Sequence, residues 1–126
     1  MKELALFTNF VFKHFICDFI LQRKYQYENK HIYGHLGGIL HAGIHMLGTF
    51  LIVLYFVSSF KMAFCMALVD GILHYHIDLA KSRLSIKYDL KSNNDWFWIL
   101  LGIDQMLHYL TYIIIIAVIF TAYPKL

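Results

Sequence analysis

The most constraining feature of the sequence is the segment from Leu36 to Ser58, which contains no Lys, Arg, Asp or Glu. The hydrocarbon core of a bilayer is about 30 Å thick, and a helix crosses it with about 20 mostly apolar residues. Three further apolar stretches lie at about 4–21, 60–79 and 96–123. We therefore expect an all-α, polytopic membrane protein. Its four transmembrane helices should form one compact bundle, a single domain over residues 1–126.

A soluble four-helix bundle is the main alternative, and the composition argues against it. Apolar residues make up 60% of the chain, against about 45–50% in an average soluble domain, and charged residues 15%, against about 25%. A soluble bundle also needs a polar face on every helix, and the part of the last stretch around Ile113–Ile116 has none. Because Cys17 and Cys65 lie in apolar runs, we predict neither a disulfide framework nor a cysteine zinc site.

The charged residues between the apolar stretches predict an orientation. The short turn at Ser58-Ser59 should join the second and third helices as an antiparallel hairpin, which leaves the polar connections 22–35 and 81–95 on one side. By the positive-inside rule, we expect an inner-membrane, multi-pass protein with both polar connections in the cytoplasm and both termini outside. The cytoplasmic side would carry Arg23, Lys24, Lys30, Lys81, Arg83, Lys87 and Lys91, against Lys2, Lys61 and Lys125 on the other.

Ionisable residues inside the predicted helices occur in pairs that are four residues apart. Residues four apart lie one turn apart on the same face of a helix, and each pair falls in the cytoplasmic half of its helix. Ionisable groups inside a membrane are costly and are usually functional. The pairs therefore predict one buried site to which every helix contributes two side chains: His14 and Asp18, His41 and His45, His74 and Asp78, Asp104 and His108.

Five imidazoles and three carboxylates, without a thiolate, are typical of a metal site. Helix bundles hold two metal ions with such paired ligands from facing helices, and mixed nitrogen and oxygen ligands suit Zn, Mn or Fe. We predict one or two divalent ions, with some of the eight side chains orienting the ligands by hydrogen bonds. The alternative is a hydrogen-bonded network that only holds the helices together.

Further polar residues have predicted roles around this site. Lys13 and Asp70 should lie at similar depth; they form a buried ion pair, or Asp70 orients the ring of His74. Anchoring to anionic lipid is the alternative role for lysines at the cytoplasmic mouth. The residues predicted to hold an anionic substrate there are Gln22, Lys30, Lys81 and Gln105. Structural roles are predicted for His31, His35 and His76.

The ordered motifs resemble those of a known family. They are His14-x3-Asp18-Phe19-x-Leu21-Gln22, Asn29-Lys30, His41-x3-His45, His74-x3-Asp78-x2-Lys81 and Asp104-Gln105-x2-His108. Together they resemble domain-of-unknown-function family 3307, a family of small bacterial and phage membrane proteins, over nearly the whole chain. His76 departs from the family pattern, in which an apolar residue is more usual. The arrangement is also similar to that of small membrane-bound metal-dependent hydrolases, which is an analogy of architecture alone.

These features favour a membrane-embedded, metal-dependent hydrolase that acts near the cytoplasmic interface. The substrate would contain a phosphate or an ester and could be lipid-linked; metal-bound water would attack it, with Asp104 or Asp78 as general base. Three other functions stay open: a metal-ion or proton-coupled transporter or channel, a lipid-desaturase-like di-metal oxidase, and a non-enzymatic phage membrane effector with a structural metal. Membrane lipid is the expected partner and nucleic acid is not. The glycines leave a homo-oligomer open.

Overall fold

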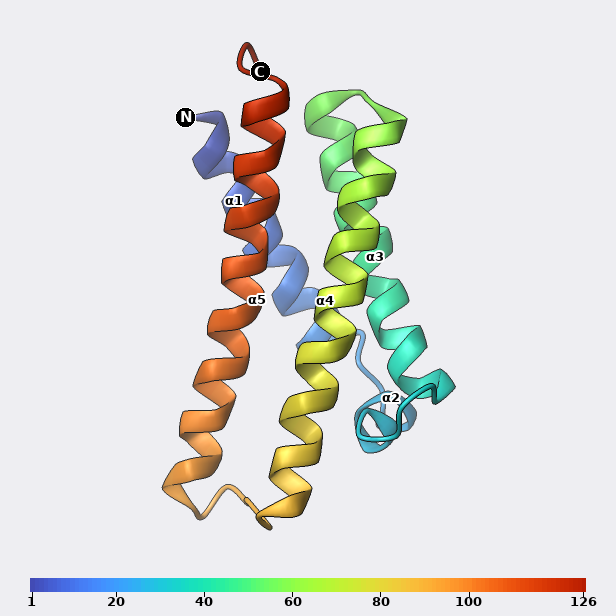
Figure 1. Cartoon of the computed structure of the whole chain (residues 1–126), viewed down its shortest axis with the longest axis vertical. Helices are drawn as coiled ribbons and strands as arrows, with labels where there is room; N and C mark the ends of the chain where they lie inside the picture. The colour runs from blue at the N-terminus through green and yellow to red at the C-terminus, as the bar shows by residue number, and fades with distance from the viewer.

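The computed structural model describes residues 1–126; 82% of the chain is in helices and there is no strand. Figure 1 shows both termini and the α3–α4 turn at one end of the molecule, and α2 and the α4–α5 connection at the other. The prediction of an all-α fold is confirmed. The elements are α1 (Lys2–Phe15), a π-helical turn (Ile16–Ile20), α2 (Lys24–Asn29), α3 (Leu36–Val57), α4 (Phe60–Lys87) and α5 (Asp95–Ala122).

Three helices, not four, are long and apolar enough to cross a membrane. They are α3, α4 and α5, so the prediction of a fourth span at about 4–21 is wrong by this measure. The reason is local: the regular α-helix of α1 ends after 14 residues, at Phe15. Its last turn and the π-helical turn that follows contain Lys13, His14 and Asp18.

The α3–α4 hairpin forms as predicted, around a turn of two residues. Ser58, with a φ of 54°, ends α3 in the left-handed conformation, and the side chain of Ser59 accepts a hydrogen bond from the backbone N–H of Met62 at the start of α4. These two positions reverse the chain directly, so α3 and α4 pack against each other along their lengths. At the other end of α3, the His35 ring accepts a hydrogen bond from the backbone N–H of Gly37.

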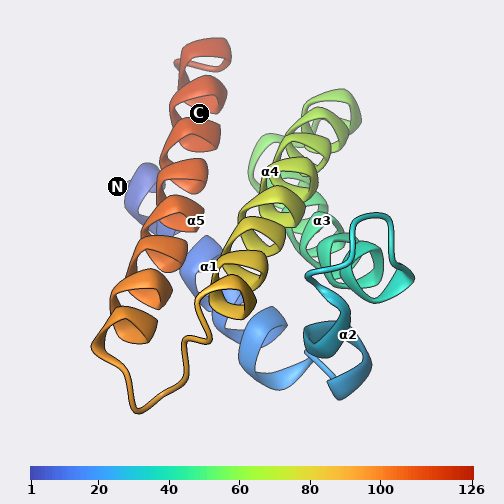
Figure 2. The ribbon, with the colours of Figure 1, turned by 60° about the horizontal axis from the view of Figure 1, so that its bottom comes forward.

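The two polar connections contain more helix than the sequence analysis predicted. The segment 22–35 includes the short helix α2, which lies beside the start of α3 (Figure 2). The segment 81–95 loses its first half to α4, which continues to Lys87. No Gly or Pro interrupts α4 after Leu79, and Lys, Arg, Leu and Ile all tolerate a helix. Hydropathy marks where an apolar stretch ends, and this helix extends beyond that point.

The four long helices form a ring. Both α1 and α4 pack against α3 and against α5, and α1 crosses the bundle obliquely (Figures 1 and 2). The half of the ring nearer the termini is filled by apolar and aromatic side chains, with the rings of Phe10 and Tyr112 stacked at 5.1 Å. This apolar core comprises Leu6, Phe10, Val53, Ala63, Met66, Tyr112, Ile115 and Ile119. The other half holds the polar residues.

The α1–α3 contact predicts a measurable difference between two glycines of α3. A Cβ atom at Gly48 would lie 2.7 Å from Cγ of Lys13, whereas one at Gly43 would meet nothing within 4 Å. Lys13 cannot easily move away, because it is held by Asp70. We expect Gly48→Ala to destabilise the protein by about 1–3 kcal/mol through overpacking. Gly43→Ala should be neutral or stabilising by about 0.5–1 kcal/mol. Unfolding in detergent micelles by titration with a denaturing detergent measures both; equal effects would contradict the close contact.

Candidate metal centre

Five histidine side chains converge on one buried space. It lies in the half of the helix bundle nearer α2. Each of them is at most 1% exposed, and each directs its Nε2 atom toward a carboxylate of the same space. The three carboxylates are largely buried as well. All eight residues that the sequence predicts as metal ligands therefore lie together: His14, Asp18, His41, His45, His74, Asp78, Asp104 and His108.

A first group of four ligand atoms consists of an oxygen of Asp18 and the three imidazole nitrogens around it. Its Oδ1 atom lies 3.0 Å from Nε2 of His41, 3.0 Å from Nε2 of His45 and 3.9 Å from Nε2 of His74. The Nε2 atoms of His41 and His74 are themselves 3.0 Å apart. In all, the four atoms lie within 4.8 Å of one another. Three imidazole nitrogens and one carboxylate oxygen at such spacing form a donor set that Zn and similar ions accept.

The π-helical turn positions Asp18 within this group. Its backbone makes an i→i+5 hydrogen bond, from the N–H of Leu21 to the carbonyl of Ile16, at 2.9 Å. The turn keeps Asp18 close to His14, with 3.1 Å between Oδ2 and Nε2, while Oδ1 faces the α3 histidines. Single π-helical turns inside α-helices are found frequently at functional sites. Here, the turn lets one carboxylate reach imidazoles of both α1 and α3.

A second group lies between α4 and α5. Nε2 of His108 is 3.7 Å from Oδ1 of Asp78 and 3.6 Å from Oδ1 of Asp104. Oδ1 of Asp104 and Nε2 of His108 are buried and make no hydrogen bond. Two ligands of one tetrahedral ion, each about 2.1 Å from it, are separated by about 3.4 Å. The spacing is thus too long for a hydrogen bond and close to that of two ligands on a shared ion.

Asp78 and His74 connect the two groups. Oδ2 of Asp78 lies 3.3 Å from Nε2 of both His41 and His74, and its Oδ1 faces His108. His74 also belongs to a third set of ligand atoms, with His14 and His108. The two groups are therefore adjacent parts of one centre, in which the Asp78 carboxylate is the natural bridge.

The centre contains more carboxylates than lysines. Its three carboxylates face one lysine, Lys30, whose Nζ lies 2.7 Å from Oδ2 of Asp78. With neutral imidazoles, two negative charges remain. Buried charge without a counter-ion is strongly unfavourable, and one divalent cation would neutralise it. The donor set and the charge of the centre thus both fit a divalent metal ion.

Three of the four predicted substrate-binding residues contact the centre. Lys30 pairs with Asp78, and the amide of Gln22 lies 3.2 Å from Nε2 of His41. The amide of Gln105 lies between α1 and α5, with its oxygen 3.0 Å from Nε2 of His14 and its nitrogen donating to Oδ2 of Asp104. The fourth, Lys81, lies apart, with Nζ 5.9 Å from the centre of the Phe97 ring.

Lys13 and Asp70 form a buried ion pair, with 2.8 Å between Nζ and Oδ2, on the side of the centre nearer the termini. Nζ of Lys13 also donates to Oγ1 of Thr49 at 3.1 Å and lies 3.4 Å from Nδ1 of His45. Asp70 does not orient His74, because Nδ1 of His74 has no hydrogen-bond partner. Of the two predicted arrangements, the structure therefore shows the ion pair.

Tyr112 and Thr49 are parts of the site that the sequence analysis did not single out. The fully buried hydroxyl of Tyr112 lies 2.9 Å from Nδ1 of His14, so it fixes the orientation of that ring. Thr49 donates to Asp70 and accepts from Lys13. Each residue lies four positions after a predicted ligand, His108 and His45, and so on the same helix face. That spacing is the signal that could have identified them.

The remaining histidines lie outside the centre. His76 is exposed, and its Nδ1 donates to the carbonyl of Ile72 in its own helix. His35 accepts a hydrogen bond at the start of α3. The backbone carbonyl of His31, rather than its ring, accepts from Arg83 at 3.0 Å.

Comparison with known proteins identifies the family of this chain. No curated protein and no solved structure matches it. One family model matches residues 6–126, a range that contains all five helices almost completely and every residue of the centre. That family is described as a protein of unknown function (DUF3307). The resemblance seen in the His and Asp motifs is confirmed, and the chain belongs to the DUF3307 family.

Proposed function

We propose that the protein is embedded in a membrane. Each of the four long helices turns large apolar side chains outward: Phe12, Leu47, Phe64 and Ile114, one from each, are at least half exposed. Such a surface is unfavourable in water and suits lipid. Three helices have the length and hydropathy of spans, and α1 lies in the ring with Lys13 and His14 turned inward. The positive connections support a bacterial inner membrane, with those connections in the cytoplasm.

The centre is proposed to bind at least one divalent ion in the group of Asp18, His41, His45 and His74. One observation carries this: three buried imidazole nitrogens and one carboxylate oxygen lie within 4.8 Å of one another. A second ion would lie between Asp78, Asp104 and His108. Zn, Mn and Fe all suit these ligands.

The chemistry that this centre supports best is hydrolysis of a phosphate or ester bond. A bound ion would supply an activated water and polarise a phosphoryl or carbonyl oxygen. Asp104 is the better placed of the two predicted general bases: its Oδ1 has no hydrogen-bond partner, whereas Asp78 is paired with Lys30. Gln105 holds the other oxygen of Asp104 and fixes its direction. Lys30 lies at the edge of the centre, where it can share its charge with an anionic substrate.

Transport of ions or protons is less well supported by the outer half of the bundle. That half is filled by the apolar core, and the hydroxyls and amide near it are satisfied within their own helices. Thr8 donates to Leu4, Asn9 to Ala5 and Thr111 to Leu107, in each case to the backbone carbonyl. No chain of polar groups therefore leads from the centre to the end of the molecule that carries the termini.

Elemental analysis of the protein purified in mild detergent tests this proposal. We expect one or two equivalents of Zn, Mn or Fe per chain, and metal-dependent hydrolysis of a chromogenic aryl phosphate or aryl ester. Asp104→Asn should lower turnover by about 10²–10⁴-fold and retain the ion of the first group. Protein that is metal-free yet folded and active would contradict the metal centre, and metal flux into vesicles without hydrolysis would favour transport.

A further inference from the structure

His14 contacts two side chains of the centre through one ring nitrogen. Its Nε2 atom lies 3.1 Å from Oδ2 of Asp18 and 3.0 Å from Oε1 of Gln105. Its other ring nitrogen, Nδ1, lies 2.9 Å from the hydroxyl of Tyr112. These are ordinary hydrogen-bond distances, and the ring is 1% exposed. The imidazole is therefore fixed on both sides by partners from its own helix turn and from α5.

The partners of His14 determine which of its nitrogens carries the proton. The amide nitrogen of Gln105 donates to Oδ2 of Asp104, because an ionised carboxylate only accepts hydrogen bonds. The amide oxygen is therefore the atom that faces His14, and it also only accepts. Since Oδ2 of Asp18 is an acceptor as well, the Nε2 atom between the two oxygens must be the donor. Nδ1 then accepts from the hydroxyl of Tyr112.

A protonated ring nitrogen has no lone pair with which to bind a metal ion. This distinguishes His14 from the imidazoles of the first group. There, the Nε2 atoms of His41 and His74 face each other, 3.0 Å apart, as ligands that share an ion do. The Nε2 atom of His14 has only oxygens at such distances.

The two carboxylates held by this network belong to different groups of the centre. His14 occupies Oδ2 of Asp18, whose Oδ1 faces the imidazoles of the first group. Gln105 occupies Oδ2 of Asp104, whose Oδ1 faces His108 in the second group. In each carboxylate, one oxygen is engaged by a hydrogen bond and the other is directed to a proposed ion position.

From this pattern we infer that His14 is a positioning residue and not a metal ligand. Directly for Asp18, and through Gln105 for Asp104, it orients one carboxylate of each group so that a single oxygen faces the ion. Side chains that orient metal ligands by hydrogen bonds typically contribute about 10–100-fold to metal affinity. The inference rests on the proposed metal centre, and it assigns Gln105 to the same network instead of to a substrate.

Nitrogen-15 NMR of histidine-labelled protein in detergent micelles tests the assignment, with Zn²⁺ as the added ion. The shift of a ring nitrogen depends on whether it carries a proton, a lone pair or a metal ion. We expect Nε2 of His14 to keep its proton when Zn²⁺ is added, whereas Nε2 of His41 takes the shift of a metal-bound nitrogen. The spectra of His14→Gln and His41→Gln assign the two signals. Loss of the Nε2 proton of His14 on addition of Zn²⁺ would overturn the inference.

Replacement by glutamine separates a positioning role from a ligand role. The amide N–H of a glutamine can take the place of the Nε2–H donor, so His14→Gln should bind Zn²⁺ about as tightly as the unaltered chain, in competition with a coloured chelator. His14→Leu cannot donate and should bind Zn²⁺ about 10–100-fold more weakly. His41→Gln is the matched control, because the same change at a proposed ligand should remove at least one equivalent of Zn²⁺ per chain. Equal losses in His14→Gln and His41→Gln would make His14 a ligand and refute its positioning role.

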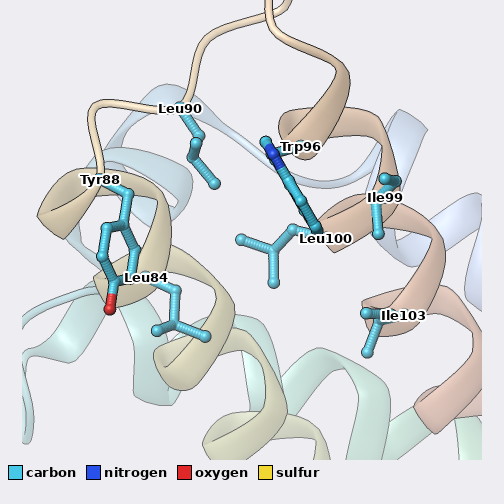
Figure 3. Close-up of a pocket in the computed structure, with 7 residues that line it drawn as sticks. All are labelled: Leu84, Tyr88, Leu90, Trp96, Ile99, Leu100 and Ile103. Atoms are coloured by element: carbon cyan, nitrogen blue, oxygen red, sulfur yellow. The ribbon is translucent and has the colours of Figure 1, made fainter.

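A control on α5 separates the hydrogen bonds from packing. An apolar pocket of about 420 Å³ lies between the end of α4 and the start of α5, and Figure 3 shows Ile99 on its α5 side among other apolar and aromatic side chains. Gln105→Leu should weaken Zn²⁺ binding as His14→Leu does, whereas Ile99→Ala, six residues away on the same helix, should leave it unchanged. Equal weakening by both α5 variants would show a general loosening of the helix and overturn the inference. Unaltered protein that takes up no Zn²⁺ would contradict the metal centre itself, and binding of Zn²⁺ through His14 would contradict this inference alone.

Discussion

Replacement of Asp70 by Ala, with Lys13 retained, is expected to destabilise the protein by about 3–5 kcal/mol, because it leaves an unpaired charge inside the bundle. The side chain of Lys13 is 5% exposed and has its only carboxylate partner in Asp70. Thr49 and the Tyr112 ring, 4.5 Å from Nζ, remain as weaker partners. Unfolding in micelles by a denaturing detergent gives the loss directly.

Two controls separate the charge from the volume. The double variant Lys13→Met with Asp70→Leu removes both charges, and it should recover most of the loss or exceed the original stability, as apolar replacements of buried pairs do. Glu28→Ala breaks an exposed pair with Lys24, 3.7 Å long, and should cost less than about 1 kcal/mol. A double variant as unstable as Asp70→Ala would show that packing, rather than the unpaired charge, causes the effect.

Replacement of His74 by Ala should have the largest effect on the centre. His74 contributes to the first group with Asp18 and also faces His14 and His108, so both proposed ion positions lose a ligand or a neighbour. Loss of a hydrogen-bond partner of a ligand typically weakens metal binding by about 10–100-fold. Loss of the ligand itself should exceed this and lower the metal content by at least one equivalent per chain. Elemental analysis after gel filtration measures the content.

His76→Ala is the matched control for this variant. It lies two residues away on the same helix and is exposed, and its ring bonds only to its own backbone. It should bind metal as the unaltered chain does. Tyr112→Phe provides an intermediate case, because it removes only the group that orients His14, and we expect affinity to fall within the range of about 10–100-fold. A His74→Ala protein that remains folded with its full metal content would refute the ligand assignment.

Much of the fold could be predicted because it depends on local patterns. The uncharged segment from Leu36 and the Ser58-Ser59 turn define the α3–α4 hairpin almost to the residue. Two features depend on more than hydropathy. Lys81 to Lys87 are polar enough to end an apolar stretch but form good helix, so α4 extends further than the stretch. α1 is charged at Lys13 and Asp18, and its place in the ring comes from tertiary partners that no window of sequence contains.

The eight residues at the centre could be predicted because each pair shares one helix face. Their division into groups could not, since it depends on how four helices meet: Asp18 joins the α3 histidines, and Asp78 lies between His74 and His108. The partner of Lys13 is among the predicted arrangements, and the position of Tyr112 four residues after His108 is the signal that could have identified its role. The metal ion and the reaction stay predictions, which elemental analysis and the hydrolysis assay address.

The ion pair across the ring also bears on how the protein is made. Lys13 lies on α1, and its counter-charge Asp70 follows 57 residues later in the chain. During translation, α1 is therefore complete while its buried lysine still lacks a partner, and α1 is not among the helices that are long and apolar enough to cross a membrane. The α3–α4 hairpin does have that composition, and it brings Asp70 with it. In the membrane-embedded protein proposed above, insertion of the first helix would await the hairpin, and α5 would complete the centre last.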